Sequence, residues 1–413
     1  MLLPFLCKLF NRIFSSGEFP DQWTKSIIVP VHKKGNVNIT DNYRGIALID
    51  VISKVYTSIL TNRVTFYVEA YRRICESQGG FRAGYSTIDN AYILYAIIQK
   101  YLCRKKKTLY VAFIDFQKAF DSVDRSILYN VLQKNCIKGN LLNAIQSLYS
   151  CVKSCVKTST GHSDFFNCPV GLRQGCKLSP ILFVMFINEL SVKLQDNNTR
   201  GVQIYPDTTE IFMLMFADDI ALISDTVVGL QKQLNILYDF SIQNKLCVNI
   251  SKTKVMAFKK GGVLARREKW MYAKEPLEVV NEFTYVGVYF TSQLSMHKIA
   301  KAISMKAKTA LIILLNVLYQ FKCLPFKSFF KLFDSNIASI LLYGSEIWGL
   351  TTMPSIENVQ MYACKRFLNV SKMSCNDAVI GDLGRYPIYV FAAKRCIKYW
   401  LRLIKMPNTR YAR

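Results

Sequence analysis

The stretch MLMFADDIAL, residues 213–222, constrains the fold most, because it places two adjacent aspartates between two apolar runs. The runs IFMLMF and IALIS have the length of short strands, so the pattern predicts a β-hairpin with Asp218 and Asp219 at its turn. Desolvation and like-charge repulsion both oppose ionisation of a buried carboxylate pair. A divalent cation would offset that cost, whereas a turn that faces solvent would avoid it. The motif alone leaves both alternatives open.

A third carboxylate, Asp115, ends the β-rich run LYVAFID. A strand end is where an α/β scaffold presents a carboxylate to a ligand. If this strand pairs beside the hairpin, Asp115 and Asp218 can hold two metal ions roughly 3.5–4 Å apart. Such a pair activates a 3′-hydroxyl nucleophile and stabilises charge on a transferred phosphoryl group. The three carboxylates therefore point to phosphoryl transfer.

The segment GLRQGCKLSP, residues 171–180, is a second candidate for ligand contact. Gly175 lets the backbone approach a ligand closely, and Gln174 offers both donors and acceptors. Ser179 is expected to be the N-cap of a helix with Pro180 at its first position, which leaves backbone N–H groups free for an anion. The following run SPILFVMFINEL is apolar on all sides and predicts a buried helix. An ordinary loop and helix cap is the alternative.

The charge balance bears on the partner. With 54 Lys and Arg against 28 Asp and Glu, the formal net charge is +26, which favours a polyanionic partner, nucleic acid or an anionic membrane, over a merely well-solvated basic surface. The 13 cysteines contain no CxxC pair, so scattered thiols are expected. No apolar run reaches the roughly 18 residues of a membrane span. The start MLLPFLCKLFNRIF predicts an amphipathic helix rather than a signal peptide, so an intracellular protein of nucleus or cytoplasm is expected.

Taken together, the motifs resemble those of reverse transcriptases. The palm motifs of that family are matched by FIDFQKAFDSVDR, GLRQGCKLSP, FADDIALI and NISKTKVMAF. The finger motifs of the non-LTR (LINE-like) retrotransposon enzymes are matched by VPVHKKG, NYRGIALI, SKVY and SQGGFRAGYST, and FTYVGVYF is similar to the primer-grip strand. Each motif is weak alone, but this many in the family's order are specific.

The resemblance implies an α+β, right-hand polymerase fold with a helical C-terminal region. The expected divisions are fingers at 1–107, palm at 108–265, primer grip and thumb at 275–320, and helices at 321–413. The family's endonuclease domain and Cys/His-rich region are not recognisable, so the chain is expected to be a truncated element whose upstream finger segments are missing.

The resemblance also implies residue roles. Asp115 and Asp218 are expected to bind two Mg²⁺ ions, with Mn²⁺ as a possible substitute, and Asp219 is the family's third acidic residue. Lys252 matches a lysine proposed as the general acid for pyrophosphate, and Lys254 competes for that role. Asp121 and Asp124 follow the strand end and are interpreted as local helix-start or salt-bridge residues.

The incoming nucleotide is expected to meet a second set of residues. Phe120 matches the aromatic steric gate against a ribose 2′-hydroxyl, although without the family it would be assigned to the core. Arg44 matches a finger arginine on the triphosphate, assisted by Lys33 or Lys34. The nucleotide-binding residues implied are Lys34, Arg44, Phe116, Phe120, Gln174 and Gly175.

Template and primer are expected at Arg82, Tyr285 and Gly287, with a structural role for Arg82 as the open alternative. The implied function is RNA-templated DNA synthesis from dNTPs in mobile-element replication, with an RNA template and a DNA primer as partners and no membrane or stable protein partner. A catalytically inactive, nucleic-acid-binding relic is the first alternative. An RNA-templated RNA polymerase or palm-type cyclase is disfavoured by QGxxxSP and the finger motifs.

Overall fold

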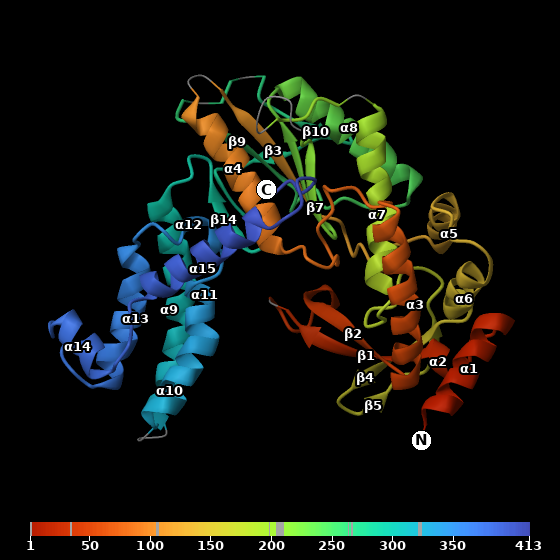
Figure 1. The fold of residues 1–413 in the computed structure, drawn as a ribbon, viewed down its shortest axis with the longest axis horizontal. Coiled ribbons are helices and arrows are strands. Elements are labelled where there is room, and N and C mark those ends of the chain that lie inside the picture. Colours follow the sequence, from red (N-terminus) through yellow and green to blue (C-terminus); the bar gives the residue numbers. More distant parts are fainter. Residues whose placement is uncertain are drawn as a thin grey trace.

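The computed structural model describes residues 2–33, 35–104, 107–197, 199–203, 210–262, 264–265, 267–320 and 324–413. Its architecture consists of a central sheet, an N-terminal sheet and a C-terminal helical region (Figure 1). The N-terminal sheet and the C-terminal helices lie on opposite sides of the molecule, below the central sheet in that view.

The central sheet has the strand order β12-β9-β3-β8-β7. Its strands are β3 (Leu109–Ile114), β7 (Met213–Phe216), β8 (Asp219–Ser224), β9 (Lys254–Phe258) and β12 (Glu278–Val279). All six residues of β3 are buried, as a central strand covered on both faces requires. The strand expected at LYVAFID and the hairpin expected around FADD are therefore confirmed.

Helices cover both faces of the central sheet. Because side chains of a strand alternate between faces, Tyr110, Ala112 and Ile114 join one hydrophobic core and the intervening residues of β3 join another. The first core includes α7 (Ser179–Asp196) and α8 (Val227–Gln243), and the second includes α4 (Thr87–Cys103). The buried helix predicted from SPILFVMFINEL is α7, but it begins at Ser179 and not after it. The predicted N-cap role is wrong, because the Ser179 hydroxyl donates to the carbonyl of Arg173 instead.

The N-terminal sheet pairs β1 (Lys25–His32) antiparallel with β2 (Tyr43–Ile49) and parallel with β4 (Lys153–Thr158). Two short strands, β5 (Gly161–His162) and β6 (Phe166–Asn167), add to β4. This sheet therefore draws strands from the range 108–265, and the sheets do not follow the expected division at residue 107. Its flanking helices are α1 (Leu3–Ser16), α2 (Asp21–Thr24), α3 (Val51–Ala70), α5 (Arg125–Lys134) and α6 (Gly139–Ser150). The predicted amphipathic N-terminal helix is α1, which buries only Phe10 and Ile13.

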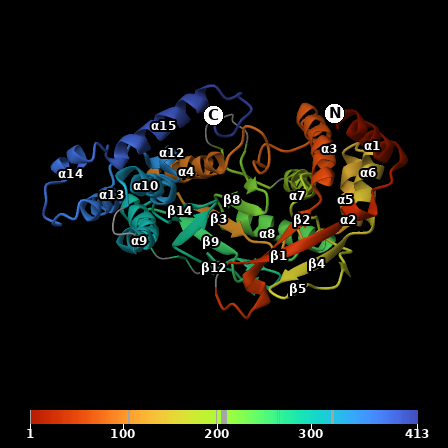
Figure 2. The ribbon, with the colours of Figure 1, turned by 90° about the horizontal axis from the view of Figure 1, so that it is seen from below.

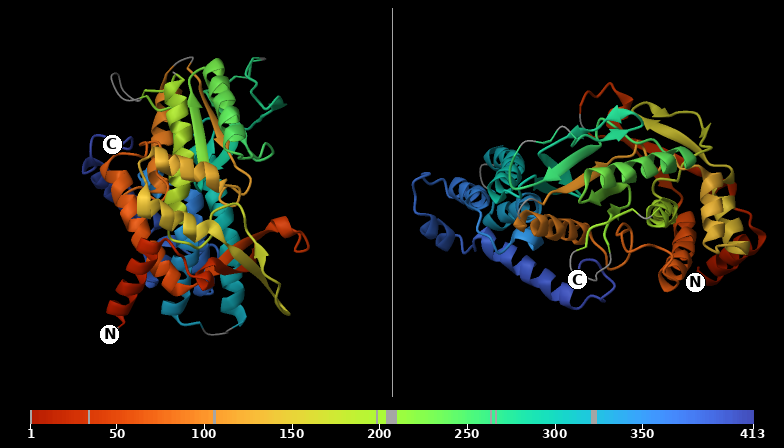
Figure 3. Two further views of the ribbon diagram at one scale, coloured as in Figure 1. Left: turned by 90° about the vertical axis from the view of Figure 1, so that its right-hand side faces the viewer. Right: turned by 90° about the horizontal axis from the view of Figure 1, so that it is seen from above.

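After the central sheet, a hairpin of β13 (Glu282–Tyr285) and β14 (Val288–Thr291) leads into the C-terminal helices. These are α9 (Met296–Gln320), α10 (Phe326–Phe333), α11 (Ser339–Leu341), α12 (Ser345–Trp348), α13 (Pro354–Phe367), α14 (Asn376–Asp382) and α15 (Ile388–Ile404). They enclose their own hydrophobic core, so the predicted helical character of this region is confirmed. Figures 2 and 3 show that α15 runs back toward α4, so that the chain returns to the middle of the molecule.

The long helix α9 is apolar enough to cross a membrane by length and composition alone, with a mean hydropathy of 1.5 over its most apolar window. The sequence prediction of no span-length apolar run did not anticipate this. In the structure, α9 packs against α13 and α11 along its buried side. A single helix of this kind is weak evidence, and the prediction of no membrane partner stays a prediction.

Candidate active site

The catalytic candidates meet at the turn of the β7–β8 hairpin. Phe216 pairs with Asp219, so Ala217 and Asp218 form a two-residue turn. Ala217 has φ +58°, a left-handed conformation that non-glycine residues rarely adopt. Two-residue hairpin turns require such angles because they match the twist of the strands. The turn therefore presents Asp218 at the edge of the sheet at the cost of local backbone strain.

Strand pairing brings Asp115 to the same place. β3 runs antiparallel to β8 with Ile114 opposite Ile220. The next residue on β3, Asp115, therefore continues the register toward Asp219, at the spacing of neighbouring strands of about 5 Å. The prediction that this strand lies beside the hairpin is confirmed, and it is the reason that three carboxylates from distant parts of the sequence gather.

The pKa values of the two adjacent aspartates of the turn, Asp218 and Asp219, are raised. Burial, followed by the charge of Asp115, raises the pKa of Asp218, and Arg44 opposes this rise. Burial raises the pKa of Asp219 to about 6, with further contributions from Asp218 and then Asp115, although part of the Asp219 side chain reaches solvent. Like charges and desolvation both disfavour the ionised forms. The site therefore holds more negative charge than its protein surroundings neutralise.

This donor set fits Mg²⁺. The ion takes oxygen ligands, and protein sites often supply only one or two carboxylates while substrate phosphates and water complete the shell. Asp115 and Asp218 are such a pair. The raised pKa of Asp218 indicates that a bound cation would stabilise its ionised form. Among the described residues, no group of three or more His, Cys, Asp or Glu side chains lies close enough together to hold a metal ion.

Lys252 lies beside this cluster. Its Nζ is 3.7 Å from a carboxylate oxygen of Asp115, and the lysine side chain is 68% exposed. The loop that carries it is fixed to the strand end, because Asn249 N–H donates to the Asp115 carbonyl and the Thr253 hydroxyl accepts from Asp115 N–H. The competing Lys254 is instead paired with Glu278 at 2.6 Å. The geometry therefore favours Lys252 as the proton donor near the site.

The nucleotide-binding candidates on the QG loop lie against the N-terminal sheet. Gln174 donates through Nε2 to Asp121 at 2.7 Å. Gly175 has φ +101°, and a Cβ there would come within 2.5 Å of the Ala47 carbonyl on β2. Only glycine permits this approach. Strand β2 also carries Arg44, which is exposed and close enough to Asp218 to influence its pKa.

A cavity of about 260 Å³ lies between β1, β2 and this loop. Arg173 lines it, is 5% exposed, and donates from Nη2 to the Lys25 carbonyl, while its Nε and Nη1 have no hydrogen-bond partner in the described part of the chain. Sequence reasoning missed Arg173, although it directly precedes Gln174. In the structure, the buried guanidinium with unpaired nitrogens identifies this residue as a candidate. In the sequence, the only indication is its position next to Gln174.

The two phenylalanines of the first motif differ in placement. Phe120 is half-buried and stacks on Phe183, with ring centroids 4.3 Å apart, while Phe81 meets it edge-on at 6.2 Å. A gate must present a rigid ring, and this packing fixes the Phe120 ring. Phe116 is 5% exposed and belongs to the core, where its backbone bridges to Val248. The structure favours a packing role for Phe116 over nucleotide contact. Lys34 lies outside the described residues.

The three template and primer candidates contact protein. Arg82 forms a two-pronged ion pair with Glu69, at 2.7 and 2.8 Å, and its side chain is 7% exposed. This supports the structural alternative for Arg82. The Tyr285 hydroxyl donates to the carbonyl of Leu214 on β7 from a 2% exposed position. Gly287 has φ +85°, and a Cβ there would meet the Tyr343 ring at 2.8 Å. Tyr285 therefore contacts the catalytic hairpin through the backbone of β7.

Two further predictions concern the helix that follows the first motif. Asp124 caps α5 by accepting from Ser126 and Ile127 N–H, and it pairs with Lys245 at 2.7 Å. Asp121 accepts from Gln174. The local role expected of Asp124 is therefore confirmed, whereas Asp121 accepts a hydrogen bond from a residue 53 positions away and neither caps a helix nor forms an ion pair in the described part of the chain.

A family model for reverse transcriptase (RNA-dependent DNA polymerase) matches residues 31–290. The match covers more than half of the chain and includes the hairpin, the QG loop and the Lys252 loop, so the chain belongs to the reverse transcriptase family. Its α+β architecture is the right-hand polymerase fold of that family.

Within the family, the relatives are enzymes of non-LTR retrotransposons. The chain is 24% identical to the probable RNA-directed DNA polymerase from transposon BS of Drosophila melanogaster, over 86% of its length and 39% of the relative's. It is 27% identical to the Pol polyprotein of the retrotransposable element R2 of Popillia japonica, over 66% of this chain and 38% of that one. The chain thus spans about two fifths of these relatives. Among solved structures, apo telomerase from Candida tropicalis is 13% identical with a TM-score of 0.48, over 97% of this chain and 68% of that one.

Proposed function

We propose that this chain catalyses RNA-templated DNA synthesis, joining dNTPs to a primer 3′-hydroxyl at Asp115, Asp218 and Asp219. The observation that carries the proposal is the meeting of three carboxylates at one sheet edge, where burial and neighbouring carboxylates raise the pKa values of Asp218 and Asp219. When bound, divalent cations supply Lewis-acid activation of the hydroxyl and neutralise charge on the phosphates. Asp115 and Asp218 would hold them.

The other residues position the nucleotide and handle a proton. Arg44 offers a planar guanidinium to the triphosphate from β2, and Gln174 approaches from the facing loop. Lys252, whose Nζ lies 3.7 Å from a carboxylate oxygen of Asp115, would give a proton to the departing pyrophosphate oxygen. Phe120 sits with its ring braced by Phe183, so a ribose 2′-hydroxyl would collide with it. Template and primer bind largely through phosphate contacts of the +26 surface.

The direct test is primer extension with purified protein on an RNA template, with dNTPs and Mg²⁺. Asp218→Ala should reduce extension by about 10³-fold or more, because several kcal/mol of charge stabilisation are lost. Asp377→Ala removes an exposed aspartate of α14, away from the site, and should extend like the wild type. Extension lost in Asp218→Ala alone supports the proposal. RNA binding with no extension by any of the three proteins would establish the non-catalytic relic instead.

Sugar selection tests the steric gate. Phe120→Val shortens the ring side chain and should raise the use of rNTPs relative to dNTPs by about 10- to 100-fold, the range that pocket shape controls. The measurement is the ratio of kcat/KM for dGTP and GTP on one template. An unchanged ratio in a folded variant would remove Phe120 from this role.

A further inference from the structure

The catalytic hairpin is held by a loop from outside the central sheet. β7 is the edge strand of that sheet, and residues 77–79 pair with it as a short parallel extension. Met215 N–H donates to the Ser77 carbonyl at 2.7 Å, and Gly79 N–H donates to the Met215 carbonyl at 2.8 Å. Asn90, at the start of α4, donates to the same carbonyl at 2.9 Å. The edge of the sheet next to the active site is thereby closed.

Gln78 on this loop reaches the catalytic turn itself. Its side-chain carbonyl accepts from Ala217 N–H at 3.0 Å and from Gly80 N–H at 2.7 Å. The side chain is fully buried. Ala217 is the residue with the left-handed backbone, directly before Asp218. A strained conformation persists only where its surroundings fix it, and the bond from Gln78 is such a restraint.

The loop also approaches the turn through its backbone. A Cβ at Gly80 would lie 2.2 Å from the Ala217 nitrogen, a distance that no side chain can occupy. The loop and the turn are therefore in direct backbone contact, and a displacement of one moves the other. Whatever fixes the loop fixes the position of Asp218.

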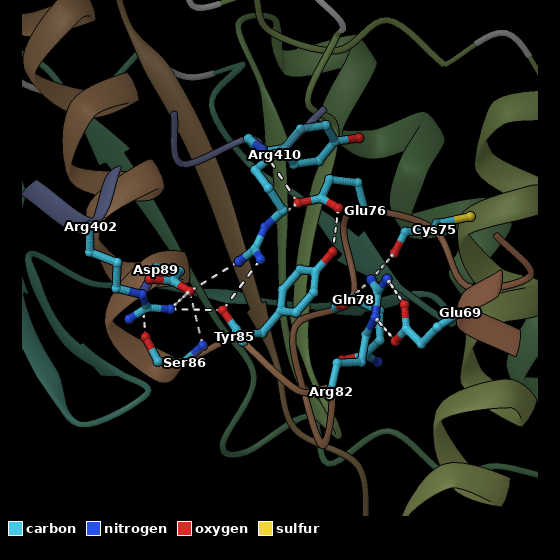
Figure 4. Close-up of polar contacts among 12 residues, drawn as sticks. Glu69, Cys75, Glu76, Gln78, Arg82, Tyr85, Ser86, Asp89, Arg402 and Arg410 are labelled. Atoms are coloured by element: carbon cyan, nitrogen blue, oxygen red, sulfur yellow. Dashed lines mark hydrogen bonds and ion pairs between the residues drawn. The ribbon is translucent and has the colours of Figure 1, made fainter. Parts of the chain in front are cut away.

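An arginine cluster fixes the loop. We use this name for Arg82, Arg402 and Arg410 together with Glu69, Glu76 and Asp89 (Figure 4). Arg410 pairs with Asp89 at 3.2 Å and with Glu76 at 3.0 Å, and Arg402 pairs with Asp89 at 3.0 Å. Both arginines also donate to the Gly84 carbonyl of the loop. Residues 399–411, here called the C-terminal arm, thus fasten the loop to the start of α4.

Tyr85 joins the two sides of the arginine cluster. Its ring lies between two guanidinium groups, with Arg410 at 3.4 Å and Arg82 at 4.1 Å from the ring centroid. Its hydroxyl donates to Glu76 at 2.6 Å. Arg82 in turn donates to the Gln78 carbonyl at 2.9 Å and pairs with Glu69 on α3. Figure 4 shows the continuous series of contacts from the arm, through Tyr85, to Gln78.

Buried ion pairs contribute little net stability, since desolvation offsets their attraction, but the several ion pairs and hydrogen bonds of this network together restrict the geometry of the loop. From these contacts we propose that the C-terminal arm and Gln78 are positioning elements for the catalytic turn: Arg402 and Arg410 hold the loop at residues 75–86, and Gln78 holds Ala217 and hence Asp218. None of these residues touches the reacting atoms. The effect on catalysis rests on the proposed polymerase function, whereas the effect on the turn does not.

The first test measures the turn without any activity. Hydrogen exchange of the amides of Gly80 and Ala217 reports the two bonds that Gln78 accepts. Arg410→Ala should speed their exchange by about tenfold or more, because the loop opens locally without global unfolding. Arg385→Ala is the matched control, since Arg385 is a similarly buried arginine of the C-terminal helices, 12% exposed and paired with Asp334. It should leave both amides unchanged.

If Arg410→Ala does not fold, Arg402→Met serves in its place, because Arg402 is 40% exposed and loses fewer contacts. Gln78→Met removes the acceptor at similar length and gives the limiting exchange rate. A folded Arg410→Ala or Arg402→Met with wild-type exchange at Ala217 would overturn the proposal. So would equal acceleration in Arg385→Ala, because the effect would then be general loosening.

The second test uses primer extension. Arg410→Ala and Gln78→Met should each lower kcat by about 10- to 100-fold, as small misplacements of reacting groups do, with KM for dNTP changed less than about twofold. Because both act on one turn, the double variant should lose no more than the worse single variant. Multiplying effects, or a loss carried by KM, would contradict positioning. If the variants show faster exchange at Ala217 but the wild type has no polymerase activity, the proposed function is refuted and the positioning of the turn is still established.

Discussion

The catalytic carboxylates and the arginine cluster each contain three acidic side chains, but they differ in how many basic partners those side chains have. In the arginine cluster three carboxylates meet three arginines, and Asp89, which is 2% exposed, has two of them as partners. At the catalytic turn Lys252 lies 3.7 Å from Asp115, and the pKa values of Asp218 and Asp219 are raised. In the arginine cluster each carboxylate has an arginine as ion-pair partner within the protein. At the catalytic turn, under the proposed function, cations and phosphates would offset the remaining negative charge.

The largest difference should appear on removing one charge from the arginine cluster. Asp89→Asn leaves two arginines without their shared partner and weakens the capping box at the start of α4, so it should lower the free energy of unfolding by about 3–5 kcal/mol. Urea denaturation measures this. Asp334→Asn is the control, because Asp334 is 54% exposed in its pair with Arg385 and should cost about 0–1 kcal/mol. Equally small losses of unfolding free energy in both variants would mean that the arginine cluster contributes no more to stability than an exposed ion pair does.

The lysine at the catalytic turn should matter for chemistry and not for stability. Lys252→Met should slow extension by about 10²-fold, the contribution of a general acid, while changing the free energy of unfolding by no more than about 0.5 kcal/mol. Lys254→Met is the control, because that lysine pairs with Glu278. A greater loss of extension in Lys254→Met than in Lys252→Met would reassign the proton donor.

The smallest effect has the opposite sign to that of Asp89→Asn. The pKa of Asp219 in the folded protein, about 6, lies above its ordinary value, so the folded state binds more protons between about pH 4 and pH 6. Stability without metal should therefore fall as pH rises through this window. Asp219→Asn removes the charge and should stabilise the metal-free protein at pH 7 by about 1 kcal/mol after allowance for solvent screening. Thermal unfolding at pH 4.5 and 7 measures it, and a destabilised variant at pH 7 would contradict the unpaired state of this carboxylate.

Local patterns in the sequence predicted the catalytic turn, because a hairpin and a strand end are encoded by short-range alternation of side chains. FADD, LYVAFID and the QG loop lie where their patterns placed them. The pairing of β4 with β1 was not predictable, because the paired residues lie about 128 positions apart in the chain, as in Ser26 with Ser154. Ser179 was wrongly expected to cap α7, since a cap pattern cannot reveal that a tertiary acceptor has taken the hydroxyl.

The supporting contacts were beyond sequence reasoning for the same physical reason. Nothing near Gln78 indicates that its carbonyl reaches Ala217, 139 residues away. Arg82 and Tyr285 match nucleic-acid-contacting positions of the family. In the structure, Arg82 pairs with Glu69 and Tyr285 donates to the Leu214 carbonyl, so both side chains have partners within the protein. Arg173 is the reverse case. No sequence pattern distinguishes it, but in the structure its guanidinium is buried with two nitrogens that lack hydrogen-bond partners among the described residues.

The pairing of Arg410 with Asp89 joins residues 321 positions apart in the chain. Every strand of the central sheet lies between Leu109 and Val279, so the sheet and its catalytic turn can assemble while the C-terminal arm is still inside the ribosome. At about 5–20 residues added per second, the arm emerges on the order of ten seconds later. Under the proposed positioning role, a nascent chain therefore carries Asp115, Asp218 and Asp219 before it carries the residues that hold the turn, so alignment of the site would be a late step of synthesis.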